Sequence, residues 1–462
     1  MNPSGQDNVL STANVKTLLR QLAIPAITAQ VVNVLYNVVD RMYIGHIPDI
    51  GALALTGVGV CMPIIMLITA FAALVSMGSA PRASVLMGRG DNEEAHYTLG
   101  NSFIMLIIIA LVLTVFFRRF AEPILMAFGA SENTIGYAMD YMRIYTLGTI
   151  FVQFALGLNA FITAQGFAKI SMATVVIGAV INIVLDPIFI FGFHMGVKGA
   201  ALATILSQAV SAIWVLRFLT GKKTILKLQK KYFRLRGSVV GPCLLLGMSP
   251  FIMQATESAI SVCFNSSLYR YGGDIAVGSM SILTSIMQFS MLPLQGFTQG
   301  AQPITGYNFG AGNADRVRQT FRLLLRYCLT YSLILWAICM VVPRLIPSMF
   351  TGDEQLLTYT AWALRHYMAL SGIFGIQIAC QQTFIAIGNA KTSLFLAVYR
   401  KIILLIPLIY ILPAILEQKD RAVFLAEPVV DLIAVTTTAI MFAYQFKNAM
   451  KKLEAGKKPA EA

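Results

Sequence analysis

Twelve apolar segments follow one another along the 462-residue chain, and each is long enough to cross a bilayer. A transmembrane helix needs about 20 apolar residues, because the hydrocarbon core is about 30 Å thick. Only 12% of residues are charged, about half the share that is usual in globular domains, so the segments do not fit a soluble protein. The predicted spans are 18–44, 52–80, 97–117, 138–164, 170–192, 199–219, 239–269, 276–300, 319–343, 358–387, 392–415 and 423–446. We therefore expect an all-α polytopic membrane protein.

A basic connection at 220–238 divides these spans six and six. We expect an N-terminal six-helix lobe at 1–219, a cytoplasmic linker at 220–238, a C-terminal six-helix lobe at 239–446 and a basic tail at 447–462. If the N-terminus is inside, the inner segments hold about 22 Lys and Arg and the outer loops about 8. Both termini are therefore predicted to be cytoplasmic, and the formal charge of +14 is assigned to loops rather than to nucleic-acid binding.

The second half of the chain repeats the first. Pro25 and Pro250 are 225 residues apart, and a spacing of 222 then relates later motifs. The motif at that spacing pairs Pro81, Gly88 and Gly90 with Pro303, Gly310 and Gly312. Six helices is an even number, so the two lobes should be related by a pseudo-twofold axis along the membrane normal, as in transporters that alternate access.

The first span carries a polar stripe on one helical face. Its members, spaced by three or four residues, are Gln30, Asn33, Asn37 and Asp40. Tyr36 lies beside this stripe. A charge at the centre of a membrane helix costs about 2.5–3.5 kcal/mol and usually faces a bundle interior or a wet cavity. The alternative is that Asp40 lies near the helix end and reaches headgroup water, paired with Arg41.

Depth along the helices favours a site. The fifth span holds Asn182 and Asp186, one turn apart and followed by Pro187, and the sixth holds Thr204. Asp40 is about 4 residues from the outer end of its helix, and Asp186 and Thr204 are about 6, so their depths agree within a few ångströms. We predict that Asp40, Asn182, Asp186 and Thr204 form a site for Na⁺ or a shared proton. Independent interfacial residues are the alternative.

The seventh span differs from the first. Gln254, Glu257 and Ser261 share one face, and Glu257 lies well inside the span, where it either couples ions or attracts a cation. Asp40 corresponds to Asn265 in the repeat, so the acid pair is not copied. The basic residues are expected in loops and the intramembrane charges are expected to be acidic.

No nucleophile elbow, Walker A lysine motif or metal-ligand cluster stands out, which argues against an enzyme and against an ATP-driven pump. No cofactor is expected, and we expect a monomer in contact with membrane lipid. A minority of the 22 Met and 28 Phe residues is expected to line a cavity for flat apolar cations.

The chain resembles the multidrug and toxic compound extrusion (MATE) family over nearly its whole length. The resemblance combines Pro25 and Asp40 in the first helix, P-x6-G-x-G turns after the second and eighth helices, G-x-A-K turns after the fourth and tenth, and N-x-x-x-D-P ending at Pro187. It implies two lobes in a V around a central cavity, in the inner (plasma) membrane. It also implies an antiporter that exports cationic and amphipathic drugs in exchange for H⁺ or Na⁺, a property tied to multidrug and antibiotic resistance.

By the same resemblance the ion site maps onto Asp40, Asn182, Asp186 and Thr204. The substrate-cavity candidates are Asn33, Tyr36, Asn37, Asn159, Gln254, Glu257 and Ser261; Asn159 is included by analogy, since its predicted depth is nearer the inner side. Other branches carry an acid in the tenth helix, which is missing between Tyr367 and Gly388. Two alternatives stay open. One is a lipid-linked saccharide flippase, which would favour a basic cavity, and the other is a sensor or scaffold that transports nothing.

Overall fold

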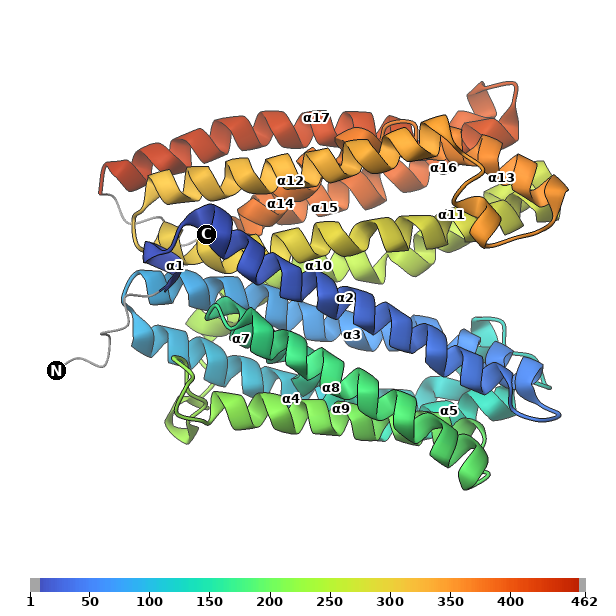
Figure 1. Ribbon diagram of the computed structural model, residues 1–462, viewed down its shortest axis with the longest axis horizontal. Helices are drawn as coiled ribbons and strands as arrows, with labels where there is room; N and C mark the ends of the chain where they lie inside the picture. Colours follow the sequence, from blue (N-terminus) through green and yellow to red (C-terminus); the bar gives the residue numbers. More distant parts are fainter. Residues whose placement is uncertain (1–8, 457–462) are drawn as a thin grey trace. The chain divides into compact units, whose positions relative to one another are not determined.

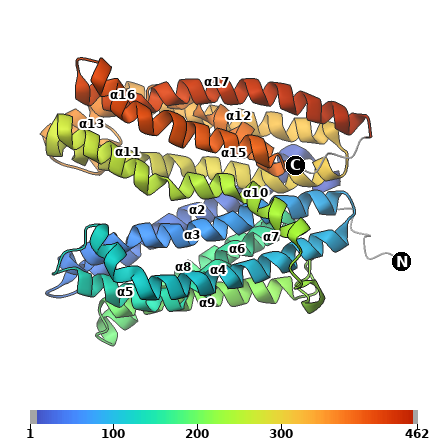
Figure 2. The ribbon, with the colours of Figure 1, turned by 180° about the vertical axis from the view of Figure 1, so that it is seen from behind.

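The computed structural model describes residues 9–456, and all regular structure in that range is helical (Figures 1 and 2). The first half contains α1 (Val9–Thr12), α2 (Val15–Gly45), α3 (Gly51–Gly88), α4 (Asn92–Ala127), α5 (Ile135–Leu147), α6 (Thr149–Gly157), α7 (Asn159–Ala164), α8 (Ala168–Pro187), η1 (Ile188–Gly192) and α9 (Val197–Leu219). After η2 (Lys230–Tyr232), the second half contains α10 (Gly237–Ala255), α11 (Glu257–Gly310), α12 (Ala314–Val341), η3 (Pro347–Met349), α13 (Glu354–Tyr367), η4 (Ser371–Ile373), α14 (Phe374–Ala386), α15 (Ala390–Val398), η5 (Tyr399–Leu405), α16 (Ile406–Ile415) and α17 (Lys419–Glu454).

These helices account for the twelve predicted spans. Within the described residues, nine stretches are long and apolar enough to cross a membrane, and two bent pairs raise the number to eleven. The bent pairs turn by 59° between α5 and the α6–α7 segment, and by 51° between α13 and α14. The twelfth span comes from a break within α11 at Gly273. The backbone of Gly273 has a φ of 65° and a ψ of −160°, which are not helical. Glycine adopts such a φ without steric cost, so α11 comprises two helices.

The chain forms two compact units, Ile24–Phe251 and Met1–Ala23 with Ile252–Ala462. The first boundary lies in α2 next to Pro25, and the second lies in α10 next to Pro250. The predicted lobes follow the sequence repeat, whereas these units follow packing. The segment before each proline therefore belongs to the unit formed mainly by the other half of the chain.

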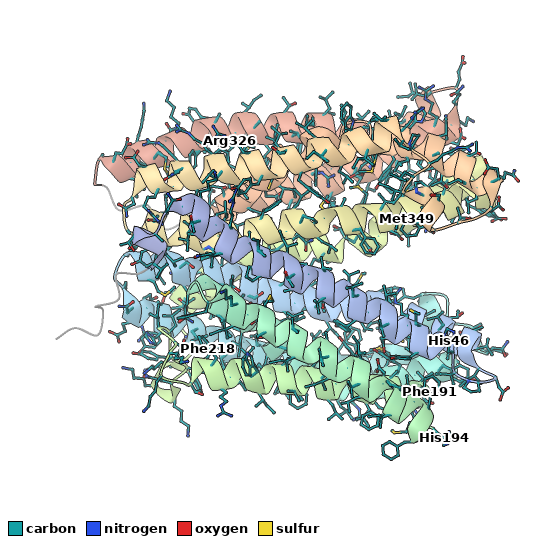
Figure 3. The ribbon with its side chains drawn as sticks, in the orientation of Figure 1. His46, Phe191, His194, Phe218, Arg326 and Met349 are labelled. Atoms are coloured by element: carbon teal, nitrogen blue, oxygen red, sulfur yellow. The ribbon has the colours of Figure 1, made fainter. Side chains whose placement is uncertain are left out.

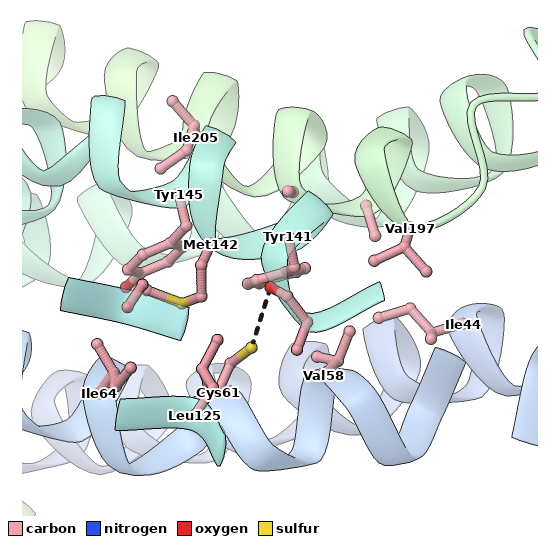
Figure 4. Packing of buried hydrophobic residues seen from close by; sticks show 14 of the residues in the cluster. Ile44, Val58, Cys61, Ile64, Leu125, Tyr141, Met142, Tyr145, Val197 and Ile205 are labelled. Carbon is pink, nitrogen blue, oxygen red and sulfur yellow. Dashed lines mark hydrogen bonds between the residues drawn. The ribbon is translucent and has the colours of Figure 1, made fainter. Parts of the chain in front are cut away.

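Each unit has its own apolar core. The core of Ile24–Phe251 includes Cys61, whose Sγ donates to the Ala138 carbonyl at 3.5 Å, among side chains from α2, α3, α5 and α9 (Figure 4). Figure 3 places His46 and His194 at one end of this unit and Phe218 at the opposite end. The turns that follow α2 and η1 are therefore at the same end, as alternating spans require. The other unit has a separate core that includes Phe264, Phe424 and Tyr367.

Two glycines that are 222 residues apart pack against the chain segments that precede Pro25 and Pro250. We call these two segments the arms. A Cβ on Gly78 of α3 would lie 1.9 Å from the Cys243 carbonyl oxygen of α10. A Cβ on Gly300 of α11 would lie 2.6 Å from the Ala23 nitrogen of α2. Each contact lies inside a single unit, the first in Ile24–Phe251 and the second in the other unit. Neither glycine has room for a side chain. The same spacing that identified the repeat thus also relates the two contacts that dock the arms.

Two buried asparagines anchor the same arms through hydrogen bonds. Asn101 accepts from the Arg236 amide at 2.7 Å and donates to the Arg234 carbonyl at 3.1 Å. Asn308 donates to the Leu10 carbonyl at 2.9 Å. Both asparagines are fully buried, so their amides satisfy backbone groups away from water.

The basic connection is also anchored, although its charge run by itself predicts only a solvated face. The Gln165 Oε1 atom accepts from the Thr224 hydroxyl at 2.9 Å and from the Ile225 and Leu226 amides at 2.7 and 2.8 Å. The Arg236 guanidinium lies 3.3 Å from the centre of the Tyr97 ring. One buried glutamine therefore fixes the start of the connection, and its charged side chains remain on the surface.

Candidate functional site

The distal end of α8 presents two polar side chains to the interior of its unit. Asn182 and Asp186 are one turn apart, and their side chains are 1% and 0% exposed. Pro187 ends α8, and the chain continues as the π-helix η1. Proline removes a backbone donor, and π-turns inside helices are frequent at functional sites. The local sequence therefore produces an irregular helix directly after a buried acid.

The structure brings the four predicted ion-site residues together. The Asn182 amide donates to Asp186 Oδ1 at 3.3 Å and to Thr204 Oγ1 of α9 at 3.5 Å. The carboxyl groups of Asp40 and Asp186 lie close enough to act on each other electrostatically. The convergence expected from helix depth is thus present, and the role of these residues in ion coupling stays a prediction.

Three buried oxygens at this site lack a hydrogen-bond donor among residues 9–456. They are Asp40 Oδ1, Asp186 Oδ2 and Asn182 Oδ1. An ionised carboxylate only accepts hydrogen bonds, so a hydrogen bond between two carboxyl groups requires a proton. Buried acceptors without partners are costly. The arrangement is therefore suited to taking up a proton or a small hard cation.

The interfacial alternative for Asp40 does not match its surroundings. Asp40 is only 9% exposed, whereas its neighbour Arg41 is exposed. Arg41 acts on Asp40 electrostatically, but the described residues contain no ion pair between them. Asp40 is thus oriented into its unit, towards Asp186.

Two tyrosines complete the surroundings of the acids. Tyr36 of α2 is near enough to Asp40 and Asp186 to interact electrostatically with both. Tyr141 of α5 lies close enough to Asp40 and Thr204 to interact with both. Sequence reasoning missed Tyr141, because no spacing pattern separates it from other aromatic residues in an apolar helix. Tyr141 is buried, with 3% of its surface exposed, and Tyr36 is half-buried.

The other candidates in this unit lie elsewhere. Asn159 of α7 donates to the Ser171 carbonyl at 3.3 Å and accepts from Thr174 Oγ1 at 3.0 Å. Thr174 is twelve residues before Asp186 on α8, or about 18 Å along the helix axis. Asn159 is therefore distant from the acid pair, in agreement with its predicted depth.

Within α2, Asn33 and Asn37 are half-buried, and the Asn37 amide donates to the Asn33 carbonyl at 2.6 Å. Both belong to the stripe that ends at Asp40. In the other unit, Gln254 is exposed and Ser261 is half-buried. Their assignment to a substrate cavity stays a prediction.

Glu257, at the start of α11, is paired. Its Oε1 accepts from the Lys401 Nζ atom at 2.6 Å, and its side chain is 54% exposed whereas that of Lys401 is 10% exposed. The half-exposed acid thus has a buried protein cation as its counterion.

The expectation that basic residues lie in loops is wrong for Arg400 and Lys401. Both are buried in the π-helix η5, inside the span predicted at 392–415. Arg400 Nη2 donates to Glu427 Oε1 at 2.6 Å and to Asp431 Oδ1 at 2.8 Å, both on α17. A sequence signal was present: adjacent Arg and Lys within one apolar span, and two acids four residues apart in the next. Their pairing explains how the span tolerates them.

A pocket in the same unit is rich in the side chains expected of a cavity for apolar cations. It is lined by Met287, Ser290, Met291, Leu294, Tyr331, Ser332, Leu335, Met368, Ser371 and Phe374. The Phe374 ring is also contacted by the Arg400 guanidinium, which lies 4.7 Å from its centre. One aromatic ring thus separates the pocket from the ionic cluster.

The family to which this chain is similar is matched twice, once in each half of the sequence repeat. The family model described as MatE matches residues 25–188 and 250–411, starting at the two repeated prolines. The multidrug export protein MepA of Staphylococcus haemolyticus is 26% identical over 401 residues, covering 85% of this chain and 86% of that protein. MepA of Staphylococcus aureus strain NCTC 8325 is 23% identical over 400 residues, covering 86% and 87%.

Solved structures share the fold. A multidrug resistance MATE family transporter of the MOP superfamily, in an outward-facing conformation, has a TM-score of 0.89 at 22% identity, covering 97% of this chain and 99% of that one. A MOP superfamily transporter from Pyrococcus furiosus, described as having a binding pocket of reverse polarity that suggests a different function, also has a TM-score of 0.89, at 23% identity. It covers 98% of this chain and 100% of that one.

Proposed function

The chain belongs to the MatE family, and from this premise we propose that it is an antiporter that exports cationic or amphipathic drugs in exchange for H⁺ or Na⁺. Family membership makes it a multi-pass membrane transporter and a multidrug exporter, not an enzyme. The exchanged ion and the class of drug are the proposal. They are supported by the acid site of the unit Ile24–Phe251 and by the MepA relatives, which are named as multidrug exporters.

The observation that carries this proposal is the pair of buried acids, Asp40 and Asp186, neither of which forms an ion pair with a cationic side chain among residues 9–456. Like charges at such short range repel strongly when water is excluded. One proton or one Na⁺ relieves the repulsion and satisfies oxygens that otherwise lack partners. Asn182 and Thr204 supply further oxygens for Na⁺, while a proton needs only the two carboxyl groups.

Coupling follows if ion and drug favour different conformations. A ligand shifts an equilibrium only by its difference in affinity for the two states. We infer that an external ion binds the acid pair and favours the return of the empty transporter, and that the drug favours the state in which the ion leaves to the cytoplasm. In the other unit we infer that Glu257, half exposed and paired with Lys401, either takes part in ion coupling or attracts cationic drugs.

The proposal includes the setting in the cell. We place the protein in the plasma (inner) membrane as a monomer surrounded by lipid, with both termini in the cytoplasm. The support is the excess of Lys and Arg in the segments on the same side as the termini. Many large apolar side chains of the spans are exposed in the monomer, among them Leu111, Val112 and Val115 of α4, which suits contact with lipid.

Efflux from cells tests the acid pair. Asp40→Asn and Asp186→Asn should each reduce the efflux of ethidium and norfloxacin to that of cells without the transporter, because the ion can no longer be bound and released. Asp140→Asn is the matched control in the same unit. Asp140 is partly exposed and pairs with Lys198 at 3.5 Å, so its loss should leave efflux unchanged. Undiminished efflux in both acid variants would sink the mechanism.

Proteoliposomes separate the coupling ions and the alternatives. A pH gradient and a Na⁺ gradient are imposed separately, and drug uptake is measured in each. Drug movement driven by only one gradient identifies the ion. Movement of a lipid-linked saccharide without drug would favour the flippase alternative. The buried side chains of Arg400 and Lys401 are of the basic kind that a flippase cavity would need. Movement of neither would favour a sensor or scaffold.

A further inference from the structure

We propose that Glu427 and Asp431 share one exchangeable proton, which makes the Arg400 cluster a second protonation site of this protein. The site lies in the unit formed mainly by Ile252–Ala462, and its ligand is a proton taken from water. This goes beyond the proposed function, which places ion binding at Asp40 and Asp186 only.

The geometry holds two carboxyl groups on one nitrogen. Glu427 and Asp431 are one turn apart on α17, and both accept from Nη2 of Arg400, at 2.6 and 2.8 Å. The three side chains are nearly inaccessible, with exposed fractions of 6% for Arg400, 6% for Glu427 and 4% for Asp431. The carboxyl groups therefore face each other across a single guanidinium edge.

The charges of the cluster do not balance. Arg400 carries one positive charge, and two ionised carboxylates would leave a net charge of −1 in a buried part of a membrane span. The nearest other cation, Lys401, is already paired with Glu257 at 2.6 Å. A net charge buried in a low dielectric is far more costly than a neutral cluster. One proton on the carboxyl pair makes the cluster neutral.

One further cation acts on the cluster: Lys401, next to Arg400 in η5, lies close enough to influence Asp431, but its Nζ atom is paired with Glu257. Tyr367 of α13 is close enough to interact with Glu427, Asp431 and Arg400, and Glu257 of α11 acts on Arg400 from its own side. Phe374 of α14 covers the guanidinium at 4.7 Å. The three groups from neighbouring helices are thus two uncharged aromatic rings and one acid.

A proton fits better than a metal ion. Hard cations take six or more oxygen ligands, whereas the guanidinium already occupies the space between the two carboxylates. Arg400 Nε is buried and has no acceptor among the described residues, so the guanidinium is not fixed on every edge. Its Nη2 atom contacts both carboxyl groups, so either of them can carry the proton while the other stays ionised. Two coupled acids then titrate as one unit.

Infrared spectroscopy of purified protein tests the proposal without relying on transport. The carbonyl stretch of a protonated carboxylic acid is separate from that of an ionised carboxylate. In an Asp40→Asn/Asp186→Asn background, we expect one buried carboxylic acid per protein at neutral pH. Glu427→Gln and Asp431→Asn should each abolish this signal, because one guanidinium then balances one carboxylate. An unchanged signal in both variants, or no signal in the background protein, would overturn the proposal.

A compensating variant excludes a merely structural effect. Arg400→Gln combined with Glu427→Gln should restore the signal on Asp431, which then has no cation to balance it. Glu454→Gln, at an exposed ion pair of the same unit, is the matched control and should change nothing. Measurements in sodium chloride and in choline chloride distinguish the ligands: a loss of signal specific to sodium would overturn the proton in favour of Na⁺. Failure of efflux by the Asp40 and Asp186 variants has no bearing on these results.

Discussion

The two units bury acids in opposite ways. At Asp40 and Asp186 two carboxyl groups meet without an ion pair to any described residue, and buried oxygens remain without donors. Around Arg400 and Lys401 it supplies two cations for three acids, and the pairs form at 2.6 to 2.8 Å. The first arrangement depends on a ligand from outside to become neutral. The second is mostly neutralised by the protein itself, so it contributes to the structure as well as holding at most one proton.

The largest effect on stability is therefore expected in the second unit. Arg400→Gln removes the only cation of a buried three-residue cluster, and leaving charged partners unpaired costs about 3–5 kcal/mol. We expect the free energy of unfolding in detergent to fall by about this amount. Asp186→Asn is the comparison in the first unit. It removes a repulsive charge, so its unfolding temperature should stay the same or rise. Equal losses in the two variants would contradict the contrast between the units.

A smaller effect shows whether the units differ only at their ionic sites. Asn101→Ala and Asn308→Ala each remove a buried amide that satisfies backbone groups of an arm. Unsatisfied buried groups cost about 1–3 kcal/mol each, so both variants should lose stability by a similar amount in chemical denaturation. Gln355→Ala, at an exposed glutamine, is the control and should be neutral. A large loss in only one asparagine variant would show that the two arms are not held alike.

The smallest effect concerns Lys401→Gln. Its partner Glu257 is half exposed, so water can solvate the acid once the cation is gone, and the loss should be below about 1 kcal/mol. Thermal unfolding in detergent measures it, with Lys198→Gln at an exposed pair as the control. A loss as large as that of Arg400→Gln would place the Glu257 pair among the buried structural charges and remove Glu257 as a cation-attracting group.

Much of the candidate site follows from elementary geometry. Rise per residue and the direction of each span were enough to predict that Asp40, Asn182, Asp186 and Thr204 meet, because helices crossing one membrane share a common depth scale. The same reasoning placed Asn159 away from them. Tyr141 could not be predicted, since a tyrosine in an apolar span has no periodic signal that marks the face it occupies.

The second unit shows where this reasoning stops. The repeat pairs Asp40 with Asn265, so it predicts no acidic counterpart at that position. It did not indicate that a different set of charged side chains is buried in the second half of the chain, namely Arg400, Glu427 and Asp431. Their pairing joins η5 to α17 and depends on how two helices pack, which their separate spans do not specify.

The sequence by itself determined the class of protein, the twelve spans, the duplication and the acids that a membrane would force into the interior. It did so because the cost of polar groups in lipid and the length of a helix across a bilayer leave few alternatives. Only the tertiary structure decided which charges have partners, which arm belongs to which unit and which glycines permit that contact. Those outcomes depend on side chains from distant segments meeting at distances of a few ångströms, where packing sets the answer.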